Sequence, residues 1–414
     1  MKKKVALVLT AALCMSAAVP VCAEEAKTIT MWTIATEGDA NHEAFQKAIE
    51  EYEASHPEID IEMEAFENES YKTKIKASVA ANELPDIYFT WGGGFSPAFV
   101  EAGKSMELDS YYESYKEDLP QSTLKYATYD GKIYGVPYVV SVSGIFYNKA
   151  MFETYGLSEP KTWDELISVC QTFLDNGITP FGTSVKEAWV MAMFNDALTL
   201  KCVGDEKLNN AFTGAGQSYL DEDFKAAADK LQQLIDMGAF SETAAGISND
   251  EAVASFTNGS VPMFVTGAWL EGSILGSEHP EDFGFMGFPV CSDNAALTDT
   301  MGGSADMLMV NPSASDPDAA ATAAFEISKL VSKYGYMTGA GIAAWKVDYE
   351  VENQSEISKT MSEFINNSTS LTVWSGSLMD AEDYTEYQAY LQQLFVGDLT
   401  AEDFVAAMDE QLND

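Results

Sequence analysis

Aromatic side chains at the ends of apolar runs are the residues of this sequence best placed to bind a ligand. Seven tryptophans occur in the 414 residues, and Trp163 falls at a helix start, where we assign it to packing. An indole face can stack on an apolar surface or attract a cation, and each ring could instead belong to a hydrophobic core. The six tryptophans at strand ends or in loops are Trp32, Trp91, Trp189, Trp269, Trp345 and Trp374.

Patterns typical of catalysis or metal binding do not occur in the sequence. No G-x-S-x-G, H-E-x-x-H or P-loop element is present, so neither these hydrolases nor an ATPase is predicted. The three histidines, His42, His56 and His279, are scattered and no C-x-x-C occurs, so the sequence indicates no zinc site and no cofactor. A secreted glycosidase is an alternative, because its two carboxylates would be hidden among 65 acidic residues.

The charge of the chain limits the class of ligand. All 23 basic residues are lysine, against 65 acidic residues. Nucleic-acid binding and adhesion to anionic lipid both depend on basic contacts, so both are disfavoured. Because no arginine is available for a bidentate contact, a phosphate or carboxylate ligand is disfavoured as well. Neutral polyols and cations are left as candidate ligands.

The first 23 residues are typical of an export signal. Three lysines precede an apolar stretch over residues 5–18, which is too short to span a bilayer. Small residues predict cleavage after Ala23, and attachment of a lipid to Cys22 is the alternative. We expect an exported protein, at the extracellular face of the membrane or in the periplasm, with 20 lysines against 65 acids and a formal charge of −45.

Three cysteines remain after that cleavage, and three cannot all pair with one another. A disulfide between Cys170 and Cys202 could form in an oxidising compartment, although the sequence alone does not establish it. The simpler interpretation is that Cys170, Cys202 and Cys291 are small hydrophobic residues of a core.

The N-terminal part of the mature chain alternates between strands and helices. Alternation and apolar runs predict strands over residues 29–34, 59–65 and 86–90. Amphipathic spacing predicts helices between them, over residues 45–52 and 71–80. This order is typical of a parallel sheet covered by helices, in which ligands lie beyond the carboxyl ends of the strands. The residues at those ends are Trp32, Thr33, Glu37 and residues 91–93.

Residues 131–149 separate this unit from a second one. Their β-branched and aromatic residues, punctuated by glycine and proline, predict two strands with a short crossing segment from Ser141. We interpret the stretch as a hinge between two lobes beside a ligand cleft; the alternative is a buried strand of a single domain. Further crossings are predicted before the strand over residues 307–310 and over residues 339–345. The predicted lobes are residues 24–140 with 303–338, and residues 141–302 with 339–414.

The second unit again mixes helices and strands. Thr162 and Glu165 form a predicted capping box before a helix over residues 166–174, and Thr400 is a predicted N-cap of the last helix. The other predicted helices cover residues 187–200, 224–235, 320–331, 384–395 and 404–412, and the strands cover residues 178–181, 261–265 and 283–290.

Six short segments, in order along the chain, resemble the extracellular solute-binding proteins of ATP-driven sugar importers, of the maltose-binding-protein type. Together they extend over nearly the whole mature chain. The sequence departs from the family where Asn82 and Glu83 replace a usual glycine, and where Ser141 replaces a charged residue of maltose binders. The segments are the opening strand at 29–32, NELPDI at 82–87, GKIYGVP…YNK at 131–149, PKTWDE at 160–165, NGITP at 176–180 and residues 256–269.

The resemblance implies a fold, a site and a set of partners. The fold would be α/β, a two-lobe periplasmic-binding-protein fold of type II, each lobe a mainly parallel sheet flanked by helices and joined by a multi-segment hinge. The lobes of a monomer would close on a carbohydrate and the closed form would dock on the permease subunits of an ABC importer. A cation such as a polyamine is the alternative ligand. The implied ring platforms are Trp32, Trp91, Trp189, Trp269 and Trp345.

A sugar offers apolar C–H faces and a rim of hydroxyl groups, so its site needs polar groups beside the aromatic platforms. Glycines would let backbone N–H groups approach the ligand, and carboxylates would accept hydrogen bonds from hydroxyls. Glu37 and Glu187 could instead be solvated surface acids. The candidate polar residues are Glu37, Gly92, Ser141, Glu187, Gly303, Ser304 and Asp306.

Overall fold

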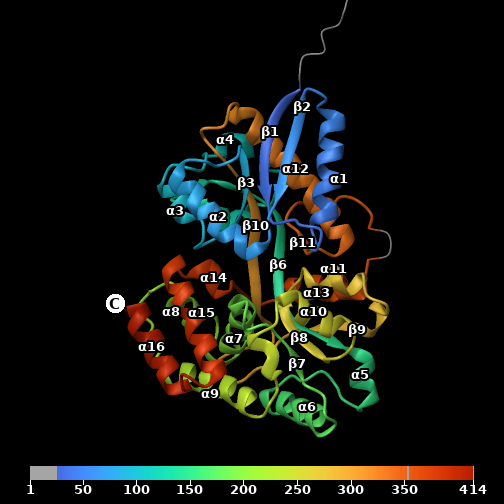
Figure 1. Ribbon diagram of the computed structural model, residues 1–414, viewed down its shortest axis with the longest axis vertical. Coiled ribbons are helices and arrows are strands. Elements are labelled where there is room, and N and C mark those ends of the chain that lie inside the picture. The colour runs from blue at the N-terminus through green and yellow to red at the C-terminus, as the bar shows by residue number, and fades with distance from the viewer. Residues whose placement is uncertain (1–25, 352–353, 414) are drawn as a thin grey trace, which may run out of the picture.

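The computed structural model describes residues 26–351 and 354–413, with the side chains of Ser304 and Ala305 left out. The predicted export signal over residues 1–23, with Cys22, lies outside the described residues. The described chain forms two lobes, one above the other in Figure 1. We name the lobe that contains the first three strands the first lobe, and the lobe that contains the last two helices the second lobe.

Two long strands run from one lobe into the other. They are β6 (Gly135–Asn148) and β10 (Asp299–Val310), and they pair antiparallel over residues 135–142 and 302–309. The two strands and crossing segment predicted over residues 131–149 therefore form one continuous strand, β6. Almost every residue of β6 is buried, because the strand has neighbours on both edges in each lobe.

The pairing between β10 and β6 is irregular where the strands pass between the lobes. The register shifts between Gly302 and Ala305, and again between Asp306 and Met307. Gly303 lies in the first shift and has a φ of +89°, a conformation that glycine adopts at little cost. Such bulges bend a strand and redirect its side chains, so β10 changes direction at the level of Asp306.

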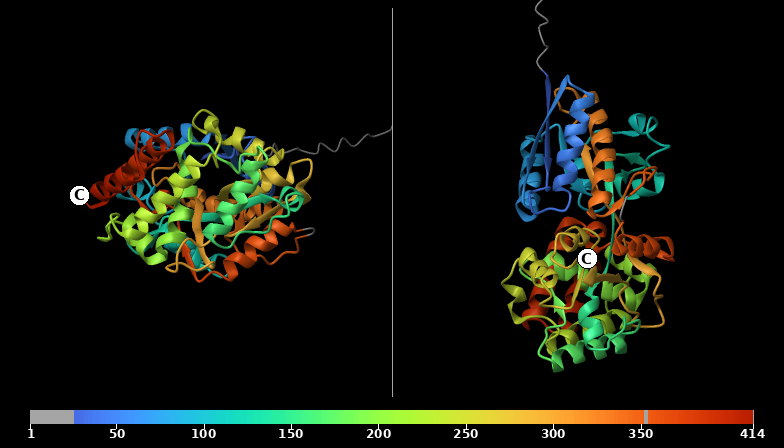
Figure 2. Two further views of the ribbon diagram at one scale, coloured as in Figure 1. Left: turned by 90° about the horizontal axis from the view of Figure 1, so that it is seen from below. Right: turned by 90° about the vertical axis from the view of Figure 1, so that its right-hand side faces the viewer.

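The first lobe contains the strand order β2-β1-β3-β10-β6, in which only β10 and a short strand, β11, run against the others. Helices α1 and α12 lie side by side against this sheet (Figure 2). The three strands and two helices predicted for residues 29–90 are confirmed. The bounds are β1 (Lys27–Thr33), α1 (His42–Ser55), β2 (Ile59–Ala65), α2 (Asn68–Ala81), β3 (Ile87–Trp91) and α12 (Pro317–Thr338).

The second lobe is built on the other half of β6. Strands β8 and β9 pair with its two edges, β7 pairs with β8, and β12 pairs with the start of β10. All four run against β6, so in both lobes most strands share one direction and the predicted α/β class is confirmed. The bounds are α6 (Trp163–Asp175), β7 (Phe181–Gly182), α7 (Ala188–Val203), α9 (Glu222–Asp236), α10 (Asn249–Thr257), β8 (Met263–Gly267), α11 (Leu270–Leu275), β9 (Phe283–Met286), β12 (Ser370–Thr372), α14 (Ser375–Leu378), α15 (Ala381–Val396) and α16 (Ala401–Asn413).

Shorter elements connect these strands and helices. The predicted capping box is confirmed, since the Thr162 side chain and the Glu165 side chain each accept a backbone N–H of the other residue. Thr400 likewise accepts the N–H of Asp403, at 3.1 Å. The connecting elements are α3 (Pro97–Glu101), α4 (Asp109–Tyr112), η1 (Gln121–Ala127), β4 (Thr128–Tyr129), β5 (Lys132–Ile133), α5 (Lys149–Thr154), α8 (Asp205–Phe212), η2 (Glu242–Ala245), η3 (Pro280–Asp282), β11 (Ile342–Ala343) and α13 (Glu356–Asn366).

The third crossing between the lobes lies later in the chain than predicted. After α12 the chain stays beside the first lobe, where β11 pairs with β6 and the N–H of Lys346 donates to the carbonyl of Asp118 at 2.8 Å. Trp345 is 4% exposed in the core of that lobe. Residues 342–346 include the strand β11 beside β6, the buried Trp345 and Lys346 bonded to Asp118, so we propose that the crossing follows Lys346.

The described residues also bear on membrane-spanning helices, disulfides and metal sites. Within residues 26–351 and 354–413, no helix is long and apolar enough to cross a bilayer. The thiols of Cys170, Cys202 and Cys291 are all free in the structure. In the same part of the chain, no group of acidic, histidine or cysteine side chains has the arrangement of a metal site.

A substitution at Gly144 tests whether the second lobe depends on the close packing of β9 against β6. A Cβ atom there would lie 2.5 Å from Cζ of Phe285 and 2.7 Å from the carbonyl oxygen of Met286. We expect Gly144→Ala to lower the free energy of unfolding by about 1–3 kcal/mol, measured by urea denaturation. The control is Gly246→Ala, whose Cβ would meet its nearest atom at 3.6 Å. Equal stability of the two variants would contradict this role of β6.

Candidate functional site

A cleft of about 600 Å³ lies between the two lobes. Its volume is within the range of ~300–1,000 Å³ that is common for small-molecule sites. In the first lobe it is lined by the segments that follow β1, β2 and β3, and in the second by those that follow β7, β8 and β12. The site therefore lies beyond the carboxyl ends of strands in both lobes, as expected for parallel sheets.

The first-lobe wall combines polar side chains with two aromatic rings. Asp39 accepts the N–H of Asn41 at 2.8 Å in the loop after β1. Trp91 ends β3 and stacks edge to face with Phe95, with ring centroids 4.9 Å apart. Lys72, on α2, lies 5.5 Å from the centroid of the Trp91 ring. This wall therefore offers aromatic surface next to groups that can form hydrogen bonds.

The second-lobe wall carries three tryptophans in contact with one another. The centroids of Trp189 and Trp269 are 6.3 Å apart, and those of Trp269 and Trp374 are 6.0 Å apart. All three are partly exposed and line the cleft, and Tyr384 lines it beside them. They come from the start of α7, the end of β8 and the start of α14. The row of rings is an extended aromatic surface assembled from distant parts of the chain.

A glycine permits the position of the central ring. Gly267 ends β8, and a Cβ atom there would lie 2.1–2.5 Å from three carbons of the Trp269 ring. The ring therefore occupies the space that any other residue would fill at position 267. Ser141 holds the backbone between Gly267 and Trp269 in place, because its hydroxyl accepts the N–H of Ala268 at 3.2 Å.

A buried carboxylate holds the third ring in place. Asp196, on α7, accepts the N–H of Ser375 at 2.8 Å, the Ser375 hydroxyl at 2.7 Å and the Tyr387 hydroxyl at 2.7 Å. Burial raises the pKa of Asp196 to about 6, and the three hydrogen bonds oppose that increase. These contacts fix the start of α14, directly after Trp374, so Asp196 positions a cleft residue without touching the cleft.

Burial raises the pKa of two carboxylates that line the cleft. Asp306, redirected by the bulge in β10, lines the cleft together with Asp39. Burial raises the pKa of Asp306 to about 7, and the nearby Asp39 carboxylate raises it further. Burial also raises the pKa of Asp39 to about 6, against the hydrogen bond from Asn41 and the charge of His42. Burying the charged form of each carboxylate therefore costs free energy, and hydrogen bonds donated by hydroxyl groups of a ligand would reduce that cost.

Three polar atoms of cleft residues are buried without a partner in the described part of the chain. They are Nε1 of Trp189, Oδ1 of Asn68 and Oδ1 of Asn249. Asn68 belongs to the first-lobe wall, and Trp189 and Asn249 belong to the second-lobe wall. An unsatisfied buried polar atom costs about 1–3 kcal/mol. Both walls therefore contain hydrogen-bonding capacity that the protein does not use itself.

Half of the residues predicted from the sequence to bind a ligand line this cleft. Trp32 instead packs on Phe66, with centroids 5.5 Å apart, beneath the ammonium group of Lys74. Glu37 is exposed beside the cleft, Gly92 is buried at the end of β3, and neither Gly92 nor Gly303 lines the cleft. The side chain of Ser304 lies outside the description. The residues that line the cleft are Trp91, Ser141, Glu187, Trp189, Trp269 and Asp306.

Trp345 requires a correction, because it is not a cleft residue. It is buried in the first-lobe core, where its Nε1–H donates to the Pro137 carbonyl and to the Ser328 hydroxyl, both at 2.9 Å. Sequence reasoning also gave Trp374 little weight and did not select several cleft residues. The unselected lining residues that matter most here are Asp39, Asn68, Asn249 and Tyr384.

Asp306 gives the cleft a testable pH dependence. Its folded pKa of about 7 exceeds the ordinary value of 3.8, so its contribution to stability is present below pH 4 and is lost as pH rises through 7. We expect Asp306→Asn to remove that loss and raise the free energy of unfolding at pH 8 by about 1–3 kcal/mol, with a smaller gain at pH 5, where only part of the loss has occurred. Melting temperatures at both pH values measure it. Asp398→Asn, at an exposed loop residue, is the control, and an equal gain at pH 5 and pH 8 for Asp306→Asn would contradict the explanation.

Comparison with known proteins relates this cleft to a family. The sequence profile of the bacterial extracellular solute-binding proteins matches residues 38–327. An uncharacterized ABC transporter extracellular-binding protein of Pyrococcus horikoshii is 26% identical over 329 residues, 77% of this chain and 74% of the relative. A multiple sugar-binding protein of Streptococcus mutans is 25% identical over 271 residues, 64% of this chain and 63% of the relative.

A solved structure from work on xylan utilization by the thermophilic bacterium Caldanaerobius polysaccharolyticus has a similar fold. It is 31% identical and superposes with a TM-score of 0.90, covering 94% of this chain and 100% of that chain. A chitin oligosaccharide binding protein, at 22% identity and a TM-score of 0.86, has the same fold. Because the family profile covers well over half of the 414 residues, the chain belongs to the bacterial extracellular solute-binding protein family.

Proposed function

We propose that the chain captures an oligosaccharide in the cleft between its lobes and delivers it to the permease subunits of a membrane ABC importer. The observation that carries the proposal is the row of three tryptophans on one wall, opposite Trp91 and Phe95 on the other. Pyranose rings present apolar C–H faces that stack on such surfaces. An extended row of rings suits several linked sugar units better than one.

The polar groups of the cleft support the same ligand class. Sugar hydroxyls can donate to the carboxylates of Asp39 and Asp306, which reduces the cost of their burial. They can also accept from Nε1 of Trp189 and donate to Oδ1 of Asn68 and Asn249, the atoms left without partners. Relatives include a multiple sugar-binding protein and a structure from work on xylan utilization, which agrees with a carbohydrate as the ligand.

A cationic ligand such as a polyamine is the second candidate, because six acidic side chains and two lysines line the cleft. Four of those acids already have partners, among them Asp39, which accepts the N–H of Asn41. Glu67 accepts the N–H groups of two residues at the start of α2, Glu69 pairs with Lys72 at 2.7 Å, and Glu187 accepts the N–H of Asn249 at 2.8 Å. Fewer carboxylates are therefore left to neutralise a polyamine than the composition of the cleft suggests.

Each lobe would be built from separate segments of the chain. The first lobe would comprise residues 24–140, 303–338 and the segment up to Lys346, and the second lobe would comprise the rest of the mature chain. Hinge bending would occur in β6 near Ser141, in the bulges of β10 and after Lys346. The exported protein would act as a monomer and would bind its ligand without changing it chemically. Its N-terminus would be produced by cleavage after Ala23 or would carry a lipid on Cys22.

One backbone hydrogen bond and one close approach between the lobes would hold the closed arrangement. On one side of the cleft, the N–H of Gly94 in the first lobe donates to the carbonyl of Ser377 in the second, at 2.7 Å. On the other side, a Cβ atom at Gly272 of α11 would lie 3.3 Å from the Cβ of Ala40. Both contacts bring small residues of opposite lobes together at the rim of the cleft, so the closed form depends on close backbone approach.

A ligand panel tests the proposal. The purified protein is titrated with neutral mono- and oligosaccharides and with spermidine, following melting temperature and heat of binding. A ligand that binds only the folded state must raise the melting temperature. We expect saturable binding of one oligosaccharide class, weakened roughly 10–100-fold by Trp269→Ala and unchanged by Trp163→Phe, whose ring lies away from the cleft.

Other outcomes of the panel would contradict the proposal. Binding of spermidine alone would replace the sugar with a cation while leaving the fold unaffected. The appearance of a shortened oligosaccharide during the titration would indicate an enzyme. Binding that Trp269→Ala leaves unchanged would place the ligand away from the aromatic wall.

Gly94 tests whether binding requires closure. A Cβ atom at this residue would lie 2.2 Å from the carbonyl oxygen of Met379 in the opposite lobe. Gly94 is not a cleft residue, so Gly94→Ala should weaken oligosaccharide binding roughly tenfold by opposing closure alone. Calorimetric titration measures the change. Gly276→Ala, which meets no atom closer than 3.7 Å, should bind as the wild type does; an unaffected Gly94→Ala protein would argue against closure at this contact.

A further inference from the structure

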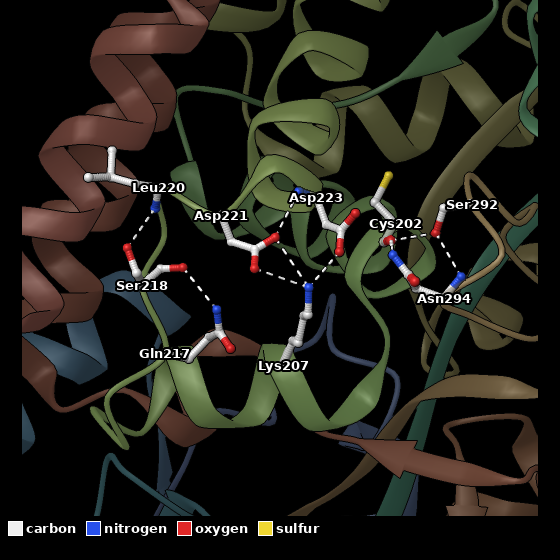
Figure 3. A network of polar contacts seen from close by, with 9 residues as sticks. All are labelled: Cys202, Lys207, Gln217, Ser218, Leu220, Asp221, Asp223, Ser292 and Asn294. Atoms are coloured by element: carbon white, nitrogen blue, oxygen red, sulfur yellow. Dashed lines mark hydrogen bonds and ion pairs between the residues drawn. The ribbon is translucent and has the colours of Figure 1, made fainter.

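The carboxyl end of α7 and the segment after β9 are fastened together in the second lobe by a group of polar contacts. The N–H of Cys291 donates to the carbonyl of Lys201 at 3.0 Å. The Ser292 hydroxyl donates to the carbonyl of Cys202 at 2.5 Å, and Nδ2 of Asn294 lies 3.4 Å from the same oxygen (Figure 3). Two consecutive residues of one segment thus bond to two consecutive residues of the other, with a cysteine in each pair.

This alignment brings the two cysteines face to face. Lys201 and Cys202 are successive residues, so a bond of 3.0 Å from the N–H of Cys291 to the Lys201 carbonyl places the Cα atoms of the cysteines within about 7 Å. Disulfides span Cα separations of ~4.4–6.8 Å. The thiols are also direct neighbours, since a contact with the Cys202 thiol, followed by burial, raises the pKa of Cys291.

The surroundings of the pair are rigid. Nζ of Lys201 donates to three backbone carbonyls, those of Ala296, Leu297 and Asp299, and so closes the loop that follows Cys291. A Cβ atom at Gly204 would lie 2.6 Å from the carbonyl oxygen of Asn294, so the segments also approach closely at that point. Little backbone movement is therefore needed or allowed when the two sulfur atoms approach one another.

We propose that Cys202 and Cys291 form a disulfide once the chain has left the cytoplasm, while Cys170 stays a free thiol. Proteins outside the cytoplasm meet oxidising conditions in which thiols at this spacing pair. Cys170 lies on α6, outside the two segments that these hydrogen bonds align, and its thiol is buried. The pair replaces the link between Cys170 and Cys202 that the sequence suggested. This inference goes beyond ligand binding and does not depend on which ligand is bound.

The oxidant would be a small disulfide or an oxidised thiol–disulfide oxidoreductase. The thiolate of Cys291, the more exposed of the two, attacks one sulfur of the oxidant, releasing a first thiol and leaving a mixed disulfide. The thiolate of Cys202 then attacks the protein sulfur of that mixed disulfide and releases the second thiol. The protein loses two protons and two electrons, and the oxidant is reduced to two thiols. Since both thiols are sheltered in the folded protein, oxidation is faster during folding.

Peptide mapping by mass spectrometry tests the pair directly. The mature chain is purified without reductant after secretion, or refolded from urea with glutathione disulfide as the oxidant, and digested under acidic conditions. We expect one cross-linked product that joins the peptide of Cys202 to the peptide of Cys291, with Cys170 labelled by maleimide after denaturation. Three free thiols after refolding with glutathione disulfide, or a link that includes Cys170, would overturn the proposal.

Melting temperature provides an independent test with matched variants. A disulfide between Cys202 and Cys291 closes a long loop of the chain. We therefore expect the oxidised protein to melt about 5–10 °C higher than the reduced protein. Cys170→Ser should preserve the difference, and Cys291→Ser and Cys202→Ser should each abolish it. A difference that persists in Cys291→Ser would contradict the assignment, even if that variant is less stable overall, because the comparison is made between its own two redox forms.

Discussion

The sharing of β6 and β10 between the lobes is the constraint on which the rest of the structure depends. Each strand satisfies its backbone hydrogen bonds first in one sheet and then in the other, so neither lobe can be separated from its partner without breaking both. The cleft lies where these strands pass between the lobes, and the bulges in β10 turn the side chain of Asp306 into it. The same crossing therefore connects the lobes, permits bending and supplies a polar group of the site.

The aromatic wall depends on residues that do not themselves meet a ligand. Gly267 leaves room for the ring of Trp269, and the buried carboxylate of Asp196 fixes the turn behind Trp374. Rigid support of this kind places large rings at a low cost in conformational entropy when a ligand binds. Glycines at the rim, Gly94 among them, let the lobes approach at the level of the backbone. Small residues thus set both the position of the rings and the closeness of the lobes.

The sequence was sufficient to predict the α/β class, most first-lobe elements and two helix caps, because these depend on local periodicity and capping chemistry. The family resemblance also led to Trp91, Trp189 and Trp269, and Asp306 was among the candidate polar residues; all four line the cleft. The sequence did not identify Asp39, Asn68 or Asn249, which are ordinary loop and cap residues until the fold brings them to the cleft. Trp345 was misplaced for the converse reason: a loop tryptophan is drawn into a core by contacts with Pro137 and Ser328 from distant segments.

The central claim is that an oligosaccharide is held between two lobes that close on it. Small-angle X-ray scattering of the protein with and without a bound oligosaccharide measures the relative position of the lobes in solution. The account predicts that the ligand lowers the radius of gyration to the value calculated from the present structure, in which both rims of the cleft are in contact. An oligosaccharide that binds with no change in the radius of gyration, from a free form more open than this structure, would contradict capture by closure.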